Sequence, residues 1–174
     1  MTERDTPNIH ILSNMNIIKY DNEAAVRYAY AWAYSRNPKY HDFSGMGGNC
    51  TNFVSQCLVA GGMPMNQTYL GWFYKSLNSR SPSFTGAHYL HNFLTQKVIR
   101  RGPFANLAAA HQAKIGDIIQ LSFDGIYFTH SVIVVQTDFQ NPLVAANSYD
   151  VYGKPLDLYT YRESRTLKIL GAFN

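Results

Sequence analysis

Hydrophobic residues recur at helical spacing along two segments in the first part of the chain. The first segment follows Asp21 or Asn22, either of which can cap a helix, and Pro38 ends it. The second begins at Cys50, two positions after the paired glycines Gly47-Gly48, and stops at Gly61. The spacing therefore predicts two helices joined by a glycine-containing loop.

The hydrophobic spacing changes to that of β-strands after residue 115. A third helix is predicted before this change, over about residues 86–97, and residues 123–126 form a predicted hairpin turn. Helices followed by an antiparallel meander make an α+β domain, in which the sheet packs on the helix that carries Cys50. The predicted strands cover residues 117–122, 127–136, 143–147 and 167–173.

The length and composition are those of one globular domain. With 174 residues, 46% of them hydrophobic, the chain can bury a core of its own. We place the domain at residues 20–174, after an arm at residues 1–19. Charged residues are only 15% and Tyr numbers 13, so the surface is polar mainly through uncharged groups, which suit sugars and peptides. The net charge of +4 favours an anionic polymer, but no basic run exceeds Arg100-Arg101, and nucleic-acid binding is not predicted.

Both cysteines are predicted to be free thiols. On one helix, Cys50 and Cys57 lie roughly 10 Å apart, too far for a disulfide. The first 16 residues lack the apolar core of a signal peptide, and no segment is long enough to cross a membrane. The chain as printed is therefore expected to be cytoplasmic, or exported by a signal-independent route, without membrane insertion. It carries no cofactor motif.

Cys50 is the candidate nucleophile. It lies in the first turn of its helix, where free backbone N–H groups and the positive end of the dipole favour the thiolate. Free cysteines are also often small buried hydrophobes, and this segment alone gives both interpretations equal weight.

His130 is the candidate base for Cys50. In a strand, His130 shares a face with Phe128, Val132 and Val134, and we expect this face to look toward the Cys50 helix. The pairing of a thiol with an imidazole would follow from that arrangement. The alternative is a core histidine that bonds to the backbone.

A third group would orient the imidazole. Asn147 ends the apolar run of its strand and is preferred, with Asp150 as the competing candidate. Either residue can instead belong to a turn. Asp117, after Gly116, is more simply explained as a turn residue than as a catalytic one.

A metal site is a weaker alternative. His88 and His91 stand three residues apart on one predicted helix, which is a usable spacing for two ligands. No third ligand or Glu-containing motif follows them, so no metal is predicted.

Several ordered motifs resemble a known family. The chain is similar to the "putative amidase domain" family of Gram-positive bacteria, in the papain-like class that includes the CHAP and NlpC-type cell-wall hydrolases. The resemblance spans Tyr20 to about Leu156, and Asn49 stands where the family more often has Asp. The matching segments are Asn22–Val26 with Trp32, Arg36–Tyr40, Gly47–Cys57, Gly71–Tyr74, Gly116-Asp117 and His130–Val134.

The resemblance implies a papain-like fold and cysteine-dependent hydrolysis of an amide bond, in peptidoglycan or a related peptide. Cys50 would be the nucleophile, His130 the base and Asn147 the third residue. The backbone N–H of Cys50, with the side chain of Asn49, would hold the oxyanion.

Three aromatic residues, Trp72, Tyr74 and Tyr69, are expected to line the substrate groove, although aromatic clusters more often belong to a core. The alternative to an enzyme is a catalytically inactive module on the same fold that binds cell wall or glycan.

Overall fold

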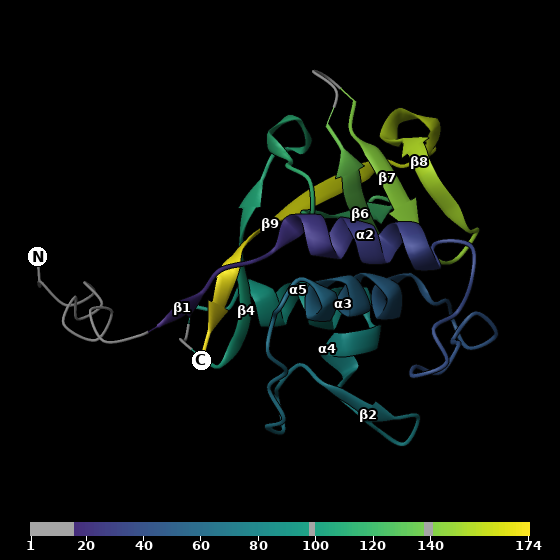
Figure 1. The fold of residues 1–174 in the computed structure, drawn as a ribbon. Coiled ribbons are helices and arrows are strands. Elements are labelled where there is room, and N and C mark those ends of the chain that lie inside the picture. Colours follow the sequence, from purple (N-terminus) through teal and green to yellow (C-terminus); the bar gives the residue numbers. More distant parts are fainter. Residues whose placement is uncertain (1–15, 98–99, 138–140) are drawn as a thin grey trace, which may run out of the picture.

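The protein has an α+β fold, described by a computed structural model over residues 16–97, 100–137 and 141–174 (Figure 1). Its helices are α2 (Asn22–Trp32), α3 (Cys50–Ala60), α4 (Pro82–Thr85) and α5 (Ala87–Leu94), with short 3₁₀ turns at Ala110–Gln112 and Leu156–Leu158. Its strands are β1 (Ile17–Ile18), β2 (Tyr74–Ser76), β3 (Ser79–Arg80), β4 (Gly102–Ala108), β5 (Ile118–Ser122), β6 (Phe128–Gln136), β7 (Leu143–Ala146), β8 (Val151–Pro155) and β9 (Glu163–Phe173).

The two predicted N-terminal helices are confirmed and lie antiparallel to one another. The Asp21 side chain caps α2 by accepting a hydrogen bond from the Ala24 N–H at 2.8 Å. The Asp21 N–H donates to the Gly61 carbonyl at 3.0 Å, which ties the start of α2 to the end of α3. α2 stops at Trp32, several residues before the predicted stop at Pro38.

All seven strands of the main sheet pair antiparallel, in the order β1-β9-β5-β6-β7-β8, with β4 also paired to β9. The predicted meander is present as β5 to β7, whereas the fourth predicted strand, β9, pairs with β5. β4 and β8 were not predicted, because Pro103 and Gly153 interrupt their strand patterns. β9 is longer than predicted, beginning at Glu163, and holds the two parts of the sheet together.

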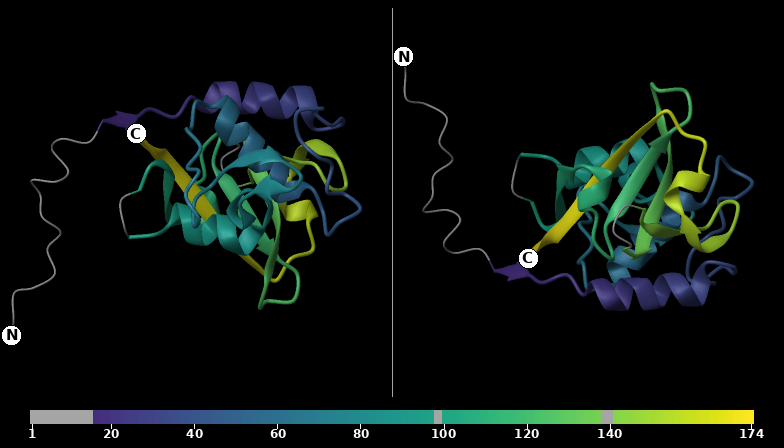
Figure 2. Two further views of the ribbon diagram at one scale, coloured as in Figure 1. Left: turned by 90° about the horizontal axis from the view of Figure 1, so that it is seen from below. Right: turned by 90° about the horizontal axis from the view of Figure 1, so that it is seen from above.

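The start of the described chain joins the sheet. Ile17 and Ile18, assigned to the arm by the sequence, pair with Phe173 and Ala172 of β9. Figure 2 shows this strand beside the C-terminus. Residues 1–15 of the predicted arm lie outside the described residues.

The sheet is buried on both faces, which corrects one prediction. Ile133 and Val135 of β6 pack with the helices in the main core, whereas Val132 and Val134 pack in a second core on the other face. The row that includes His130 was expected to look toward α3, and that expectation was wrong. Because positions 132–135 are all apolar, their alternation cannot tell which set faces the helices.

Gly71 allows two segments of backbone to approach closely after α3. A β-carbon at this position would lie 2.0 Å from the carbonyl oxygen of Asn66. The neighbouring Trp72 carbonyl accepts a hydrogen bond from the Asn66 N–H at 2.8 Å, so the two segments cannot easily separate. This contact fixes the loop that follows α3.

We therefore expect Gly71→Ala to lower the free energy of unfolding by about 3 kcal/mol, because backbone must move to admit the methyl group. Gly45→Ala is the matched control, since nothing lies within 4 Å of its added β-carbon. Urea unfolding of the two variants measures the difference. Equal stabilities would contradict the close approach at Gly71.

Candidate functional site

The thiol of Cys50 is buried at the first turn of α3, with only 6% of the residue exposed. Its Sγ lies 3.8 Å from the Thr129 carbonyl oxygen and 3.9 Å from the Thr51 hydroxyl. Burial raises the pKa of Cys50, and hydrogen bonds from groups such as the Ser131 N–H offset only part of the rise. The expectation of a favoured thiolate is therefore wrong for the protein without substrate, in which the thiol keeps its proton.

His130 lies near the start of β6, beside an irregularity in its pairing with β5. The imidazole is 7% exposed, and its centre lies 5.7 Å from the Tyr159 ring and 6.2 Å from the Phe123 ring. Burial, with a smaller effect of the Lys154 charge, lowers the pKa of His130 to about 4. The ring is therefore neutral at pH 7 and can accept a proton.

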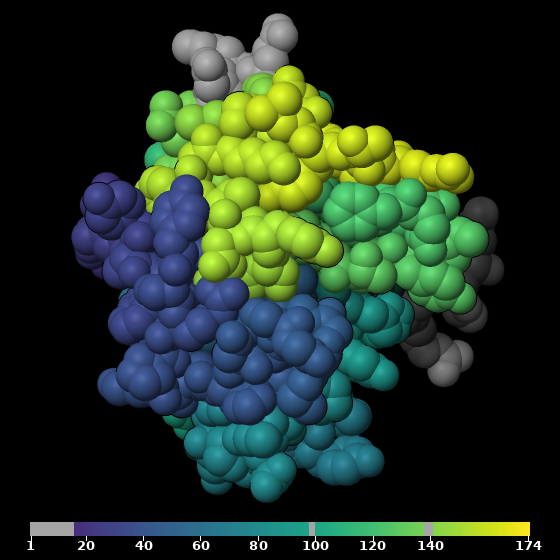
Figure 3. Space-filling view, turned by 90° about the vertical axis from the view of Figure 1, so that its right-hand side faces the viewer, coloured from purple at the N-terminus to yellow at the C-terminus, as the bar shows by residue number. Residues whose placement is uncertain are grey.

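Cys50 and His130 line the same cleft although their elements differ. The cleft has a volume of about 680 Å³, and its other walls come from the Gly47-Gly48 loop, the β5–β6 hairpin and the β7–β8 turn. Figure 3 shows the face on which the blue loop, the lime β7–β8 segment and the green hairpin meet. His130 reaches the cleft from near the start of β6, so its place on the far face of the sheet does not separate it from Cys50.

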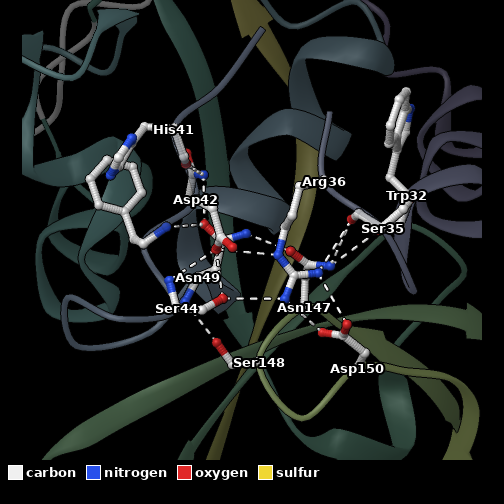
Figure 4. Close-up of polar contacts among 12 residues, drawn as sticks. Trp32, Ser35, Arg36, His41, Asp42, Ser44, Asn49, Asn147, Ser148 and Asp150 are labelled. Carbon is white, nitrogen blue, oxygen red and sulfur yellow. Dashed lines mark hydrogen bonds and ion pairs between the residues drawn. The ribbon is translucent and has the colours of Figure 1, made fainter. Parts of the chain in front are cut away.

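Asn147 has a different position from the one predicted. Its amide nitrogen donates to the carbonyls of Trp32, Ala33 and Ser35, at 3.1, 3.1 and 3.2 Å. Its amide oxygen accepts a hydrogen bond from the Asn49 side chain. Among the described hydrogen bonds none joins Asn147 to His130. In this structure Asn147 fastens the end of α2 to the start of α3 rather than orienting the imidazole (Figure 4).

The competing third residue, Asp150, is also engaged elsewhere. Its carboxylate makes a two-point ion pair with the Arg36 guanidinium, at 3.0 and 3.1 Å (Figure 4). Arg36 also pairs with Asp42 at 3.2 Å and donates to the Ser44 hydroxyl. Arg36 thus joins the loop before α3 to the β7–β8 turn.

Asn49 was predicted to help hold the oxyanion, but its side chain is 2% exposed and fully engaged. Its oxygen accepts from the Phe43 N–H and from the Asn52 amide, and its nitrogen donates to Asn147. The backbone N–H of Asn49 donates to the Ser148 hydroxyl at 2.7 Å. Asn49 therefore supports the first turn of α3 from below.

Two of the three aromatic residues predicted for the substrate groove lie in the main core, and the third, Tyr69, is exposed outside the cleft that holds Cys50 and His130. Trp72 is 0% exposed, and its indole donates to the Ser55 hydroxyl at 3.1 Å. Tyr74 is buried beside Phe84, and its hydroxyl accepts from the His41 N–H at 2.8 Å. Neither lines the cleft, so the core alternative describes both in this structure.

The remaining candidate residues, Asp117, His88 and His91, make hydrogen bonds within the fold. Asp117 accepts from the Lys114 N–H, as a turn residue does, and also from the Ile169 N–H of β9. His88 and His91 both contact Asn92 on α5. In the described part of the chain, no three His, Cys, Asp or Glu side chains gather as metal ligands would.

Arg36 and Ser148 were not assigned roles from the sequence. Arg36 lies in one of the segments that resemble the family, but its two carboxylate partners stand 6 and 114 positions away. No local sequence pattern reveals a partner that stands 114 positions away.

The chain belongs to the family described as "Putative amidase domain", whose model matches residues 19–170. It is 41% identical over 138 residues to the Bacillus subtilis protein YhbB, which is itself uncharacterised. That alignment covers 76% of this chain and 42% of YhbB, so the chain spans less than half of this relative. No solved structure matches the chain. The family's description indicates amide hydrolysis as the chemistry.

Membrane insertion has no candidate helix here. None of the helices in residues 16–97, 100–137 and 141–174 has both the length and the hydrophobicity to cross a bilayer.

We expect Asn147→Ala to lower the free energy of unfolding by about 3 kcal/mol, because it leaves the Asn49 amide and three carbonyls without their partner. Asn106→Ala, on the exposed side of β4, is the control and should change stability by less than about 0.5 kcal/mol. Urea unfolding measures both. A small loss for Asn147→Ala would mean that this amide does not fasten α2 to α3.

We expect His130 to make the stability depend on pH between about 6.5 and 4. Below pH 6.5 the unfolded chain protonates this imidazole while the folded protein does not, so the free energy of unfolding falls as the pH falls. The loss should reach roughly 3 kcal/mol, at about 1.4 kcal/mol for each pH unit. In His130→Asn the pH dependence should be shallower by this amount, whereas His111→Asn, at an exposed site, should match the wild type. Parallel curves for wild type and His130→Asn would contradict the buried neutral ring.

Proposed function

We propose that the protein is a cysteine-dependent amide hydrolase with Cys50 as nucleophile and His130 as general base. The observation that supports it most is that these two side chains line one cleft at the first turn of α3. A thiol and a neutral imidazole in one cleft are the minimum for nucleophilic attack on an acyl carbon. Membership of the amidase family agrees with this chemistry.

In the acylation step, the Cys50 sulfur bonds to the carbonyl carbon of the substrate as His130 takes the thiol proton. The carbonyl electrons move to oxygen, where the N–H of Cys50 can stabilise the negative charge. When the intermediate collapses, the carbon–nitrogen bond breaks and the imidazolium gives its proton to the leaving amine. The product on the protein is a thioester.

In the second step, His130 takes a proton from a water molecule as the water oxygen attacks the thioester. The carbon–sulfur bond breaks, the acid leaves, and the sulfur regains its proton from the imidazolium. The sum is one amide and one water converted to one acid and one amine. Because the thiol pKa is raised and the imidazole pKa is lowered, proton transfer accompanies the attack rather than preceding it.

Peptide amides of bacterial cell-wall peptidoglycan are the substrate class that we propose. The support is the resemblance to the papain-like hydrolases of the CHAP and NlpC type, with helix-borne Cys50 preceding strand-borne His130 in the chain, as in that class. The surface, polar through uncharged groups, suits such a polymer.

The test is digestion of purified peptidoglycan by wild type, Cys50→Ala and Cys57→Ala, with released fragments identified by mass spectrometry. We expect Cys50→Ala to lose activity by about a thousandfold or more, because no other group replaces the sulfur. Cys57→Ala is the matched control, since Cys57 is 0% exposed in the core and should leave turnover near that of wild type.

Three results would contradict the proposal. Hydrolysis that survives in Cys50→Ala would show that this sulfur is not the nucleophile. Hydrolysis that a chelator abolishes would assign the chemistry to a metal. Wild-type protein that sediments with peptidoglycan but releases no fragment would instead indicate the inactive binding module.

A further inference from the structure

Tyr149 has an unusual backbone conformation at the mouth of the cleft. Its φ is 58°, and among the described residues it is the one non-glycine residue with positive φ. The residue is 95% exposed and yet lines the cleft that holds Cys50 and His130. Left-handed backbone costs a bulky residue about 1 kcal/mol or more, and glycine would avoid the cost. The exposed ring gains little from packing within the chain, so folding does not explain the presence of Tyr here.

The residues on both sides of Tyr149 are held in place. Before it, the Ser148 hydroxyl accepts from the Asn49 N–H at 2.7 Å. After it, Asp150 makes its two-point ion pair with Arg36. These contacts fix the β7–β8 turn against the start of α3 and the loop before it (Figure 4). The Tyr149 ring is thus presented at the cleft by a turn anchored at both ends.

The charges around the cleft are already paired. The charged side chains in the described lining of the cleft are those of Arg36 and Asp150, and they pair with each other. Arg36 also pairs with Asp42, so this group carries one negative charge in excess. The neutral His130 adds no positive charge at pH 7. The cleft therefore offers no unpaired cation from its described lining to a carboxylate, although the whole chain carries a net charge of +4.

We propose that Tyr149 is a specificity-determining residue, whose ring packs against an uncharged, apolar part of the substrate next to the scissile amide. Phe123, which is 45% exposed and also lines the cleft, adds a second apolar surface. Substrates with a carboxylate at this position gain no ion pair from Arg36, because Arg36 is already paired with Asp42 and Asp150. The inference deepens the proposed function and rests on it for the identity of the reacting bond.

Alkylation of Cys50 tests the cleft without requiring turnover. The probes are chloroacetamide, N-benzyl chloroacetamide and chloroacetate, each rate being divided by the rate with free glutathione. We expect the benzyl reagent to react with Cys50 about tenfold faster than chloroacetamide, and chloroacetate more slowly than either. Mass spectrometry of digested protein assigns the label to Cys50 rather than Cys57.

The variants are Tyr149→Gly, Tyr149→Phe and Tyr69→Gly. Tyr69 is the matched control because it is also 95% exposed but does not line the cleft. Tyr149→Gly should lose the preference for the benzyl reagent, while Tyr149→Phe and Tyr69→Gly should keep it. The melting temperature of Tyr149→Gly should equal or exceed that of wild type, because glycine relieves the strained backbone.

Hydrolysis of N-acetyl dipeptide coumarylamides with Leu, Gln or Glu before the scissile bond gives the second measurement. Tyr149→Gly should raise KM for the Leu substrate about tenfold with little change in kcat, and wild type should prefer Leu over Glu by about tenfold in kcat/KM.

The two proposals fail in different ways. If Tyr149→Gly behaves like Tyr69→Gly in alkylation, the role of Tyr149 is overturned, whatever the hydrolytic activity. If the benzyl preference depends on Tyr149 but neither peptides nor peptidoglycan are hydrolysed, the recognition surface stands and the proposed hydrolase function is overturned. If no probe alkylates Cys50, both are overturned.

Discussion

The side-chain contact between Asn49 and Asn147 is the interaction on which the cleft depends. It joins the residue before α3 to the residue after β7, and the other end of the Asn147 amide holds the carbonyls at the end of α2. Both side chains are almost fully buried, where an unpaired amide is costly. A helix start, a helix end and a strand end therefore keep one relative position, and that position sets where Cys50 stands.

The electrostatic state of the site is decided by burial more than by the helix dipole. The first turn of α3 has the free N–H groups that favour a thiolate, but Cys50 is removed from water and its pKa rises. His130 is removed from water as well, and its pKa falls. Both groups are thus neutral before substrate binds, which avoids the desolvation cost of a buried thiolate and imidazolium.

The cleft is assembled from loops that one cation joins. Arg36 forms ion pairs with Asp42 on the loop before α3 and with Asp150 on the β7–β8 turn. The two ion pairs that neutralise the guanidinium therefore also fix the positions of these two cleft walls. The same pairing removes Arg36 from the groups available to a ligand. The ion pairs of Arg36 therefore influence both the shape of the cleft and which charged ligands it can bind.

From the sequence we could predict the α+β class, the two N-terminal helices, strands β5 to β7 and the candidate pair Cys50 and His130. These follow from local signals, namely capping, glycine stops and hydrophobic spacing, which act within a few residues. The tertiary structure was needed to show which face of β6 meets the helices, because both faces are apolar. It likewise decided the partners of Asn147, Asp150, Asn49 and Trp72. Their hydrogen bonds and ion pairs join residues far apart in the chain, and an Asn or Asp that fastens two elements has the same local sequence as one that orients an imidazole.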